Sequence, residues 1–262
     1  MVSPFQGILN YEISKGIPPG WVNYSISKTS PNGTWHKLER GEIPMDEEYF
    51  KGFNRDLRDP QRWKDFWTQT RKKQNLEIGT IPPVPEIDGE YMFFNMMSAS
   101  RTPDPWMWPA LQKLKASGRY IIAALSNTVI FPPDHPFSRA PVDDVRGCFD
   151  VFISSAHVGL RKPDPKIYEL AVKELNKHAK EHAAAKGKDL GWADGIKPED
   201  IVFLDDIGEN LKAARKAGFG TIKVNLGMTY DAVTTLEELT GLQLAGDHPK
   251  VSSAPKIPKA RL

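Results

Sequence analysis

The chain has 262 residues, of which 40% are hydrophobic and 26% are charged, and this composition excludes a disordered or fibrous protein. Its formal net charge of +2 predicts no general affinity for nucleic acid. The single cysteine, Cys148, excludes an internal disulfide framework. No apolar run approaches the roughly 20 residues that span a bilayer, so we expect no membrane partner.

The N-terminal part of the chain is predicted to be helical. Residues 5–99 are rich in tryptophan and proline, and their apolar residues recur at helical spacing, as in Tyr49, Phe50 and Phe53. No run of β-branched residues there is typical of a strand. Three prolines within residues 82–85 predict one break between two helical stretches.

After Pro103 the pattern changes to short apolar runs that alternate with amphipathic segments, which is typical of a parallel sheet. The expected strands are residues 120–125, 151–154, 201–204 and 221–224, and the expected helices are residues 105–116, 208–217, 230–239 and one that begins at residue 165. Residues 177–188 are polar and rich in alanine, so we expect a solvated extension of that helix and a loop.

Residues 247–262 are predicted to form a flexible basic tail, because they lack periodicity and carry four basic residues against one aspartate. The chain ends in Ala260, Arg261 and Leu262, a variant of the Ser-Lys-Leu peroxisomal address. This end favours a peroxisomal import receptor as a partner and a location in the peroxisome. The alternative is an ordinary disordered terminus, with the protein in the cytoplasm.

Polar side chains follow three of the predicted strands. Ser126 and Asn127 follow the first, Lys162 lies in the loop after the second, and Asp205 and Asp206 follow the third. Because parallel strands place ligands at their carboxyl edge, we expect these side chains to converge there. The alternatives are a turn at Ser126 and a solvated lysine before a proline-initiated helix. The two adjacent aspartates favour a functional site over a purely structural role, since their like charges require a cation nearby.

Three segments resemble the second, third and fourth motifs of the haloacid dehalogenase-like hydrolases. They are Leu-Ser-Asn at 125–127, Gly-Leu-Arg-Lys-Pro-Asp-Pro-Lys-Ile-Tyr at 159–168 and Phe-Leu-Asp-Asp-Ile-Gly-Glu-Asn at 203–210. Within that family, the chain resembles phosphatase domains joined to an epoxide hydrolase or to an acyl-CoA dehydrogenase. The resemblance implies an α/β fold, with a Rossmann-like parallel sheet, helices on both faces and a helical C1-type cap. It implies a core at residues 1–9 and 104–246 and a cap at residues 10–103.

The resemblance also implies a Mg²⁺-dependent hydrolase of small phosphate monoesters. The implied catalytic residues are Lys162 and Asp205. The implied substrate-binding residues are Ser126 and Asn127, and the implied metal-binding residues are Asp206 and Asn210. In this reaction type a carboxylate attacks phosphorus, and water then hydrolyses the aspartyl phosphate. The hydroxyl, amide and lysine groups stabilise the transferring phosphoryl oxygens.

Trp35 and His36 are candidate substrate contacts, because they lie in residues 32–42, whose glycine, threonine and charged residues predict a loop of the cap. Packing inside the cap is the alternative for both. Residues 178–182 fit the H-x-x-E-H zinc pattern, but the surrounding sequence offers no apolar face that buries a metal. A solvated helix face is therefore the favoured interpretation.

The family's first motif, Asp-x-Asp or Asp-x-Gly on the first strand, has no counterpart in this sequence. The chain begins Met-Val-Ser-Pro-Phe-Gln-Gly, which resembles the stretch just after that motif, and no aspartate precedes Asp46. We expect the first strand and the nucleophile to be missing. Either the natural protein is longer, or the chain is a non-catalytic relative that keeps an anion pocket for binding or interaction. The open sheet edge predicts low stability or a partner strand.

Overall fold

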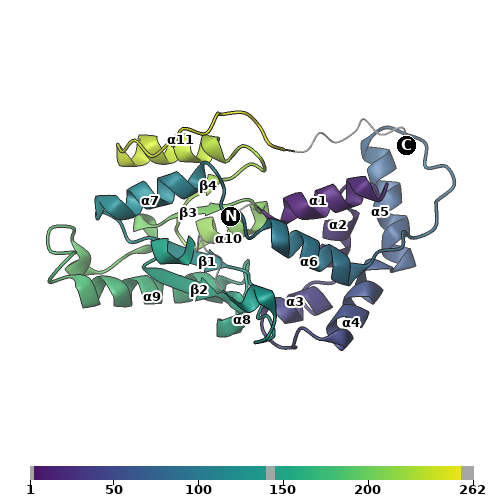
Figure 1. Cartoon of the computed structure of the whole chain (residues 1–262), viewed down its shortest axis with the longest axis horizontal. Coiled ribbons are helices and arrows are strands. Elements are labelled where there is room, and N and C mark those ends of the chain that lie inside the picture. Colours follow the sequence, from purple (N-terminus) through teal and green to yellow (C-terminus); the bar gives the residue numbers. More distant parts are fainter. Residues whose placement is uncertain (1–2, 140–144, 255–262) are drawn as a thin grey trace. The chain divides into compact units, whose positions relative to one another are not determined.

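The computed structural model describes residues 3–139 and 145–254, and the chain forms two compact units (Figure 1). The α/β unit contains Glu39–Gly41 and Arg101–Ala254, and the helical unit contains Ser3–Leu38 and Glu42–Ser100. No helix within the described ranges is long and apolar enough to cross a membrane. Residues 260–262 lie outside the described residues, so the peroxisomal address stays a prediction.

The helical unit confirms the helical character predicted for the N-terminal part. Its helices are α1 (Pro4–Ser14), α2 (Trp21–Lys28), α3 (Thr34–Glu39), α4 (Glu47–Leu57), α5 (Pro60–Lys73) and α6 (Gly89–Ala99). Asp46, Asp59 and Asp88 begin α4, α5 and α6, since each carboxylate accepts a hydrogen bond from the backbone N–H three residues later. Fully buried aromatic rings, among them Trp21 and Phe93, pack the interior of the unit.

Two predictions in this part differ from the structure. The loop predicted at residues 32–42 contains helix α3, whose first residue Thr34 donates its N–H to the Asp56 carboxylate. The sequence predicts residues 1–9 in the core, but in the structure Ser3 onwards belongs to the helical unit, because α1 packs closely against α6. A Cβ on Gly7 would lie 2.9 Å from the Cα of Met96, so only glycine permits this approach.

Glu12 gives the helical unit a predicted pH dependence. Its carboxylate is 1% exposed and accepts hydrogen bonds from the backbone N–H groups of Gly20 (2.7 Å) and Val22 (2.8 Å) at the start of α2. Burial raises the pKa of Glu12 from 4.5 to about 7, against the opposing effect of those two hydrogen bonds. Folding therefore takes up a proton between these pH values, and the unfolding free energy falls as the pH rises through this window.

We expect the unfolding free energy to fall by about 3 kcal/mol between pH 4.5 and pH 7 because of Glu12 alone. Urea unfolding of the wild type and of Glu12→Gln at several pH values measures this contribution. The glutamine variant cannot titrate, so it should lose this part of the slope. An identical slope in both proteins would show that Glu12 does not control the pH dependence.

The α/β unit alternates strands and helices as predicted. Its elements are α7 (Met107–Ser117), β1 (Ala123–Ser126), β2 (Val151–Ser154), α8 (Ser155–Val158), α9 (Pro165–His182), β3 (Val202–Asp205), α10 (Gly208–Lys216), β4 (Gly220–Lys223) and α11 (Thr229–Thr240). Short 3-10 turns lie at Pro136–Ser138, Val145–Cys148, Trp192–Asp194 and Pro198–Asp200. Strand β1 pairs with β2, strand β3 pairs with β4, and both pairs are parallel.

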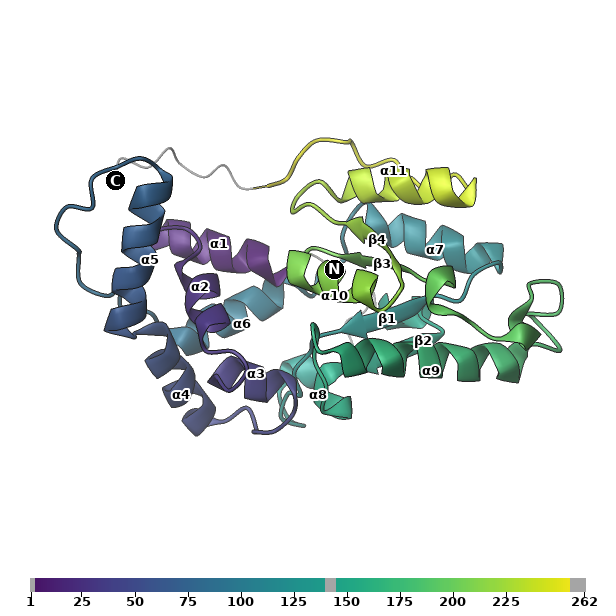
Figure 2. The ribbon, with the colours of Figure 1, turned by 180° about the vertical axis from the view of Figure 1, so that it is seen from behind.

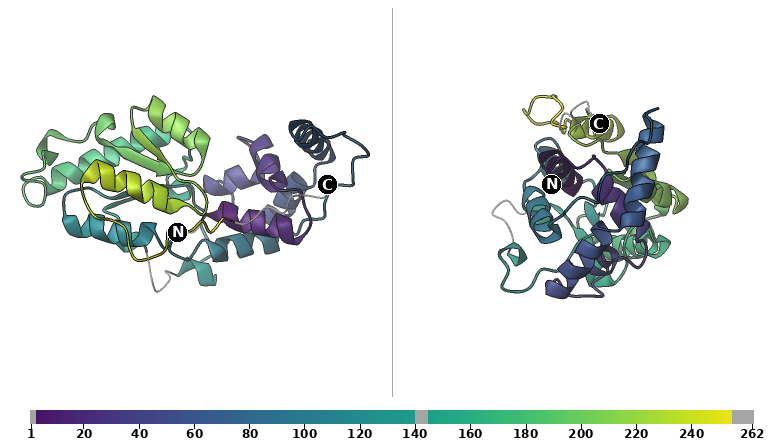
Figure 3. Two further views of the ribbon diagram at one scale, coloured as in Figure 1. Left: turned by 90° about the horizontal axis from the view of Figure 1, so that it is seen from above. Right: turned by 90° about the vertical axis from the view of Figure 1, so that its right-hand side faces the viewer.

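Two hydrophobic clusters place the strand pairs side by side. One joins α7 and α11 to Ile122 and Ile222, and the other joins α9 and α10 to Ile153 and Phe203. The second cluster contains residues from both strand pairs, and the first joins Ile222 of β4 to Ile122, the residue directly before β1. Helices cover both faces of the strands (Figure 2, Figure 3). Among the described residues, β1 and β3 each have a strand neighbour on one side only.

The helix that begins at Pro165 is less solvated near its end than we predicted. Helix α9 continues to His182, and Ala179 in its last turn is fully buried. Trp192, in the 3-10 turn that follows the helix, is 4% exposed. A Cβ on Gly187 would lie 2.6 Å from the Trp192 side chain, so the following loop folds tightly over that ring. The apolar contact explains why a segment that is polar in sequence stays helical.

The first part of the predicted tail contacts the α/β unit. The Trp106 indole N–H donates to the Pro249 carbonyl at 3.1 Å, and the Ser253 N–H donates to the Gly227 carbonyl at 2.9 Å. Residues 247–254 form no helix or strand, whereas residues 255–262 lie outside the described residues.

Candidate active site

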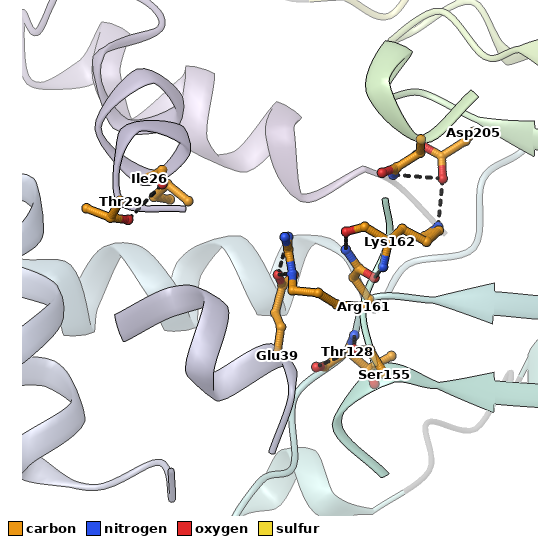
Figure 4. Close-up of polar contacts among 10 residues, drawn as sticks. Ile26, Thr29, Glu39, Thr128, Ser155, Arg161, Lys162 and Asp205 are labelled. Carbon is orange, nitrogen blue, oxygen red and sulfur yellow. Dashed lines mark hydrogen bonds and ion pairs between the residues drawn. The ribbon is translucent and has the colours of Figure 1, made fainter. Parts of the chain in front are cut away.

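The predicted site residues come from loops and helix starts that follow the strands. Ser126 is the last residue of β1, and it lies opposite Ser154 of β2 in the strand register. Lys162 lies between Gly159, where α8 ends in the left-handed conformation, and Asp164, which begins α9. The end of α8 and the start of α9 therefore enclose a short loop, in which the Lys162 side chain extends toward Asp205 at the end of β3 (Figure 4).

Lys162 and Asp205 form the centre of the site. The Lys162 Nζ lies 2.6 Å from the Asp205 Oδ2, and each residue is 8% exposed. The ammonium group also lies 5.2 Å from the centre of the Phe203 ring. Charges that are shielded from water interact more strongly, so this pair is a buried ion pair and not a surface contact.

The Asp205 carboxylate has further donors that fix its orientation. The Ile207 N–H donates to Oδ1 at 2.8 Å, and the Asn210 amide donates to the two carboxylate oxygens at 3.1 and 3.2 Å. Asn210 is 2% exposed, and its backbone carbonyl accepts a hydrogen bond from the Tyr168 hydroxyl. Burial raises the pKa of Tyr168, and the Asp205 charge raises it further, so this hydroxyl stays protonated.

Asn127 holds the backbone of the lysine loop. Its Oδ1 accepts the Lys162 N–H at 2.8 Å, and its Nδ2 donates to the Lys162 carbonyl at 3.1 Å. Both the oxygen and the nitrogen of the Asn127 amide therefore form hydrogen bonds with the backbone of Lys162. In the structure Asn127 thus holds the Lys162 backbone, and its predicted contact with phosphoryl oxygens stays a prediction.

No motif in the sequence predicts the network of hydroxyl groups beside the site. The Thr128 N–H donates to the Ser155 Oγ at 2.8 Å, and the hydroxyls of Thr128 and Ser154 lie 2.5 Å apart. The Ser154 hydroxyl also lies 2.7 Å from the His157 Nδ1. Their positions could have indicated the network, because these residues lie at or just after the carboxyl ends of β1 and β2.

The two predicted substrate contacts of the cap lie in the helical unit. The Trp35 ring packs 5.6 Å from the ring centre of Phe53 and 5.8 Å from that of Phe93. His36 is 3% exposed. Both side chains thus help to pack this unit, and a contact with substrate stays a prediction.

The oxygen ligands needed for Mg²⁺ are present only in part. Among the described residues, no group of three or more histidine, cysteine, aspartate or glutamate side chains is arranged to hold a metal. Asp206 is half-buried, next to the Asp205 carboxylate that Lys162 neutralises. Mg²⁺ commonly binds through one or two carboxylates together with waters and phosphate oxygens, so this donor set fits such an ion.

Comparison with known proteins gives the family. The sequence matches the haloacid dehalogenase-like hydrolase family over residues 29–218, which is more than half of the chain. The chain belongs to the haloacid dehalogenase-like hydrolases. Among solved structures of this family's fold, a dehalogenase aligns with a TM-score of 0.51 and 17% identity over 93% of each chain. The predicted α/β fold of this family is therefore confirmed, while the assignment of the helical unit as a C1-type cap stays a prediction.

Two curated relatives confirm the predicted resemblance within these hydrolases. Bifunctional epoxide hydrolase 2 from Sus scrofa is 28% identical over 229 residues, which cover 87% of this chain and 34% of that protein. Acyl-CoA dehydrogenase family member 10 from Mus musculus is 27% identical over 244 residues, which cover 92% of this chain and 18% of that protein. The chain thus spans about a third of the first relative and less than a fifth of the second.

Proposed function

We propose that the α/β unit belongs to a Mg²⁺-dependent hydrolase of small phosphate monoesters. The observation that carries this proposal is the buried Lys162–Asp205 pair, held by Asn127 and Asn210 where β3 ends. A fixed ammonium group in water-poor surroundings suits a substrate with two negative charges. Such a group is oriented before the reaction and needs little rearrangement when charge shifts in the phosphoryl group.

In the proposed reaction, the Ser126 hydroxyl donates a hydrogen bond to a phosphoryl oxygen, and the Lys162 ammonium offsets negative charge. Asp205 keeps that ammonium in place, and Asn127 holds the peptide that carries it. Asp206 is the proposed carboxylate ligand of Mg²⁺, which supplies Lewis-acid polarisation of the phosphoryl oxygens. Asn210 donates its amide to Asp205 and so supports this carboxylate pair.

The reaction also needs a carboxylate nucleophile. Asp46, the first aspartate of the sequence, is occupied at the start of α4, where its Oδ1 accepts the Tyr49 N–H at 2.9 Å. We propose that a strand paired with the free edges of β1 and β3 brings the nucleophile to Lys162. The non-catalytic alternative is a chain that binds phosphate at Lys162 without hydrolysing an ester.

Calorimetric titration with inorganic phosphate, with and without Mg²⁺, tests the binding part of the proposal on the chain as it stands. We expect phosphate binding that requires Mg²⁺ and weakens at least about tenfold in Asp206→Asn, because a lost charge contact is worth about 1.4 kcal/mol or more. Asp189→Asn, an exposed aspartate outside the site, is the matched control. Equal phosphate affinity in both variants, or none in the wild type, would refute the proposed site.

A further inference from the structure

Arg161, the residue before Lys162, forms its own ion pair. Its Nε and Nη2 donate to the Glu39 Oε2 at 2.8 and 2.7 Å (Figure 4). The two side chains are only 18% and 9% exposed. A guanidinium group in such surroundings cannot lose its partner without moving toward water, because an unpaired charge is costly to bury.

Glu39 is held firmly on the other side of the contact. The segment Glu39–Gly41, which starts with the last residue of α3, belongs to the α/β unit, although the sequence before and after it belongs to the helical unit. Gly41 has a φ of +66°, and a Cβ at this position would lie 2.2 Å from the Ala156 carbonyl oxygen. Only glycine allows the backbone to lie so close to α8, and this contact keeps Glu39 facing the lysine loop.

The two adjacent side chains of the loop are fixed by two different carboxylates. Arg161 extends to Glu39, and Lys162 extends to Asp205. The backbone between them is held by Asn127 and by a hydrogen bond from the Asp164 N–H to the Arg161 carbonyl at 2.9 Å. A shift of the Arg161 side chain therefore moves the peptide on which the Lys162 side chain depends.

We infer that Glu39 and Arg161 are positioning residues that hold the Lys162 ammonium against Asp205. This inference deepens the proposed function, because it assigns the control of the phosphate-binding lysine to a segment inserted between two stretches of the helical unit. Neither residue touches the substrate in this assignment. Both act through the backbone of the loop at residues 159–164.

The test measures the acetylation rate of Lys162 as a function of pH, by peptide mass spectrometry, in the full chain. The variants are Glu39→Gln, Arg161→Met and the two combined. Each should raise the Lys162 rate about fivefold or more, and the double variant should exceed neither single one, as coupled residues do. Lys166, an exposed lysine in the same peptide region, should keep its rate in every variant.

Arg215→Gln is the matched control, because Arg215 is an arginine of the same unit that bonds to Thr221 on the surface. It should leave the Lys162 rate unchanged. If Glu39→Gln does not fold, the double variant decides, since it removes both charges of the Glu39–Arg161 pair. A Lys162 rate equal to that of the wild type in folded variants would overturn the inference.

Phosphate titration of the same variants separates this inference from the proposed function. If the wild type binds no phosphate, the proposed function fails, and the Lys162 rates still decide the role of the pair. If the wild type binds phosphate and Glu39→Gln binds it with unchanged affinity and an unchanged Lys162 rate, the inference alone fails.

Discussion

Replacing Lys162 with methionine is expected to abolish phosphate binding and to lower the unfolding free energy by about 3 kcal/mol or more. The Asp205 side chain is 5% exposed, and the variant leaves its charge without the ammonium at 2.6 Å. The remaining N–H donors from Ile207 and Asn210 are dipoles and do not neutralise the charge. Urea unfolding and phosphate calorimetry measure the two effects.

A double variant separates these two effects. Lys162→Met combined with Asp205→Asn removes both charges, so it should recover much of the stability while phosphate binding stays absent. Lys166→Met is the matched control, because Lys166 is exposed in the first turn of α9, and it should change neither quantity. A Lys162→Met variant as stable as the wild type would show that the buried pair does not matter for the fold.

An apolar strand that ends in Asp-x-Asp, fused ahead of Met1, is expected to produce Mg²⁺-dependent release of phosphate from an aryl phosphate. The free edges of β1 and β3 carry backbone groups without a strand partner among the described residues. Asn127 and Asp205 both contact Lys162, so the carboxyl ends of β1 and β3 lie together. A strand that pairs with both in the same direction places its final carboxylates beside Lys162.

The expected gain is at least about a thousandfold in rate over the unfused chain, since a covalent nucleophile is added to the site that is proposed to bind the phosphoryl group. The melting temperature should rise as well, because two free strand edges become paired. A fusion with Asn-x-Asn is the control, and it should gain stability without activity. Stable fusions of both kinds without turnover would support the non-catalytic alternative instead.

The strands and the helices between them follow from local patterns. Strand β2 has the predicted bounds of residues 151–154, because a three-residue apolar run is bounded by Asp150 and by serines. Helices α9 and α10 begin at the predicted residues, since Pro165 and Gly208 mark those positions. Helix α3 was missed, because its six residues are too few to show a helical period and a tertiary contact stabilises its start.

That Asn127, Lys162 and Asp205 lie together was predictable from the sequence, but the way in which they pair was not. Strand ends indicated that Lys162 and the two aspartates meet, by the carboxyl-edge rule. Which aspartate faces the lysine depends on how the chain turns after β3. In the structure this is Asp205, because the Ile207 N–H and the Asn210 amide in the first turn of α10 donate hydrogen bonds to its carboxylate. Asn127 likewise holds the loop backbone, a role that its sequence position does not reveal.

The sequence by itself determined the alternating elements of the α/β unit, the family and the polar residue types that follow the strands. These depend on short-range periodicity and on motifs that are contiguous in the chain. Only the tertiary structure showed that Ser3 onwards belongs to the helical unit, that β1 and β3 do not pair, and that Glu39 reaches Arg161 across 122 positions. Such contacts form when segments that are far apart in the sequence pack together, and local sequence patterns do not predict that packing.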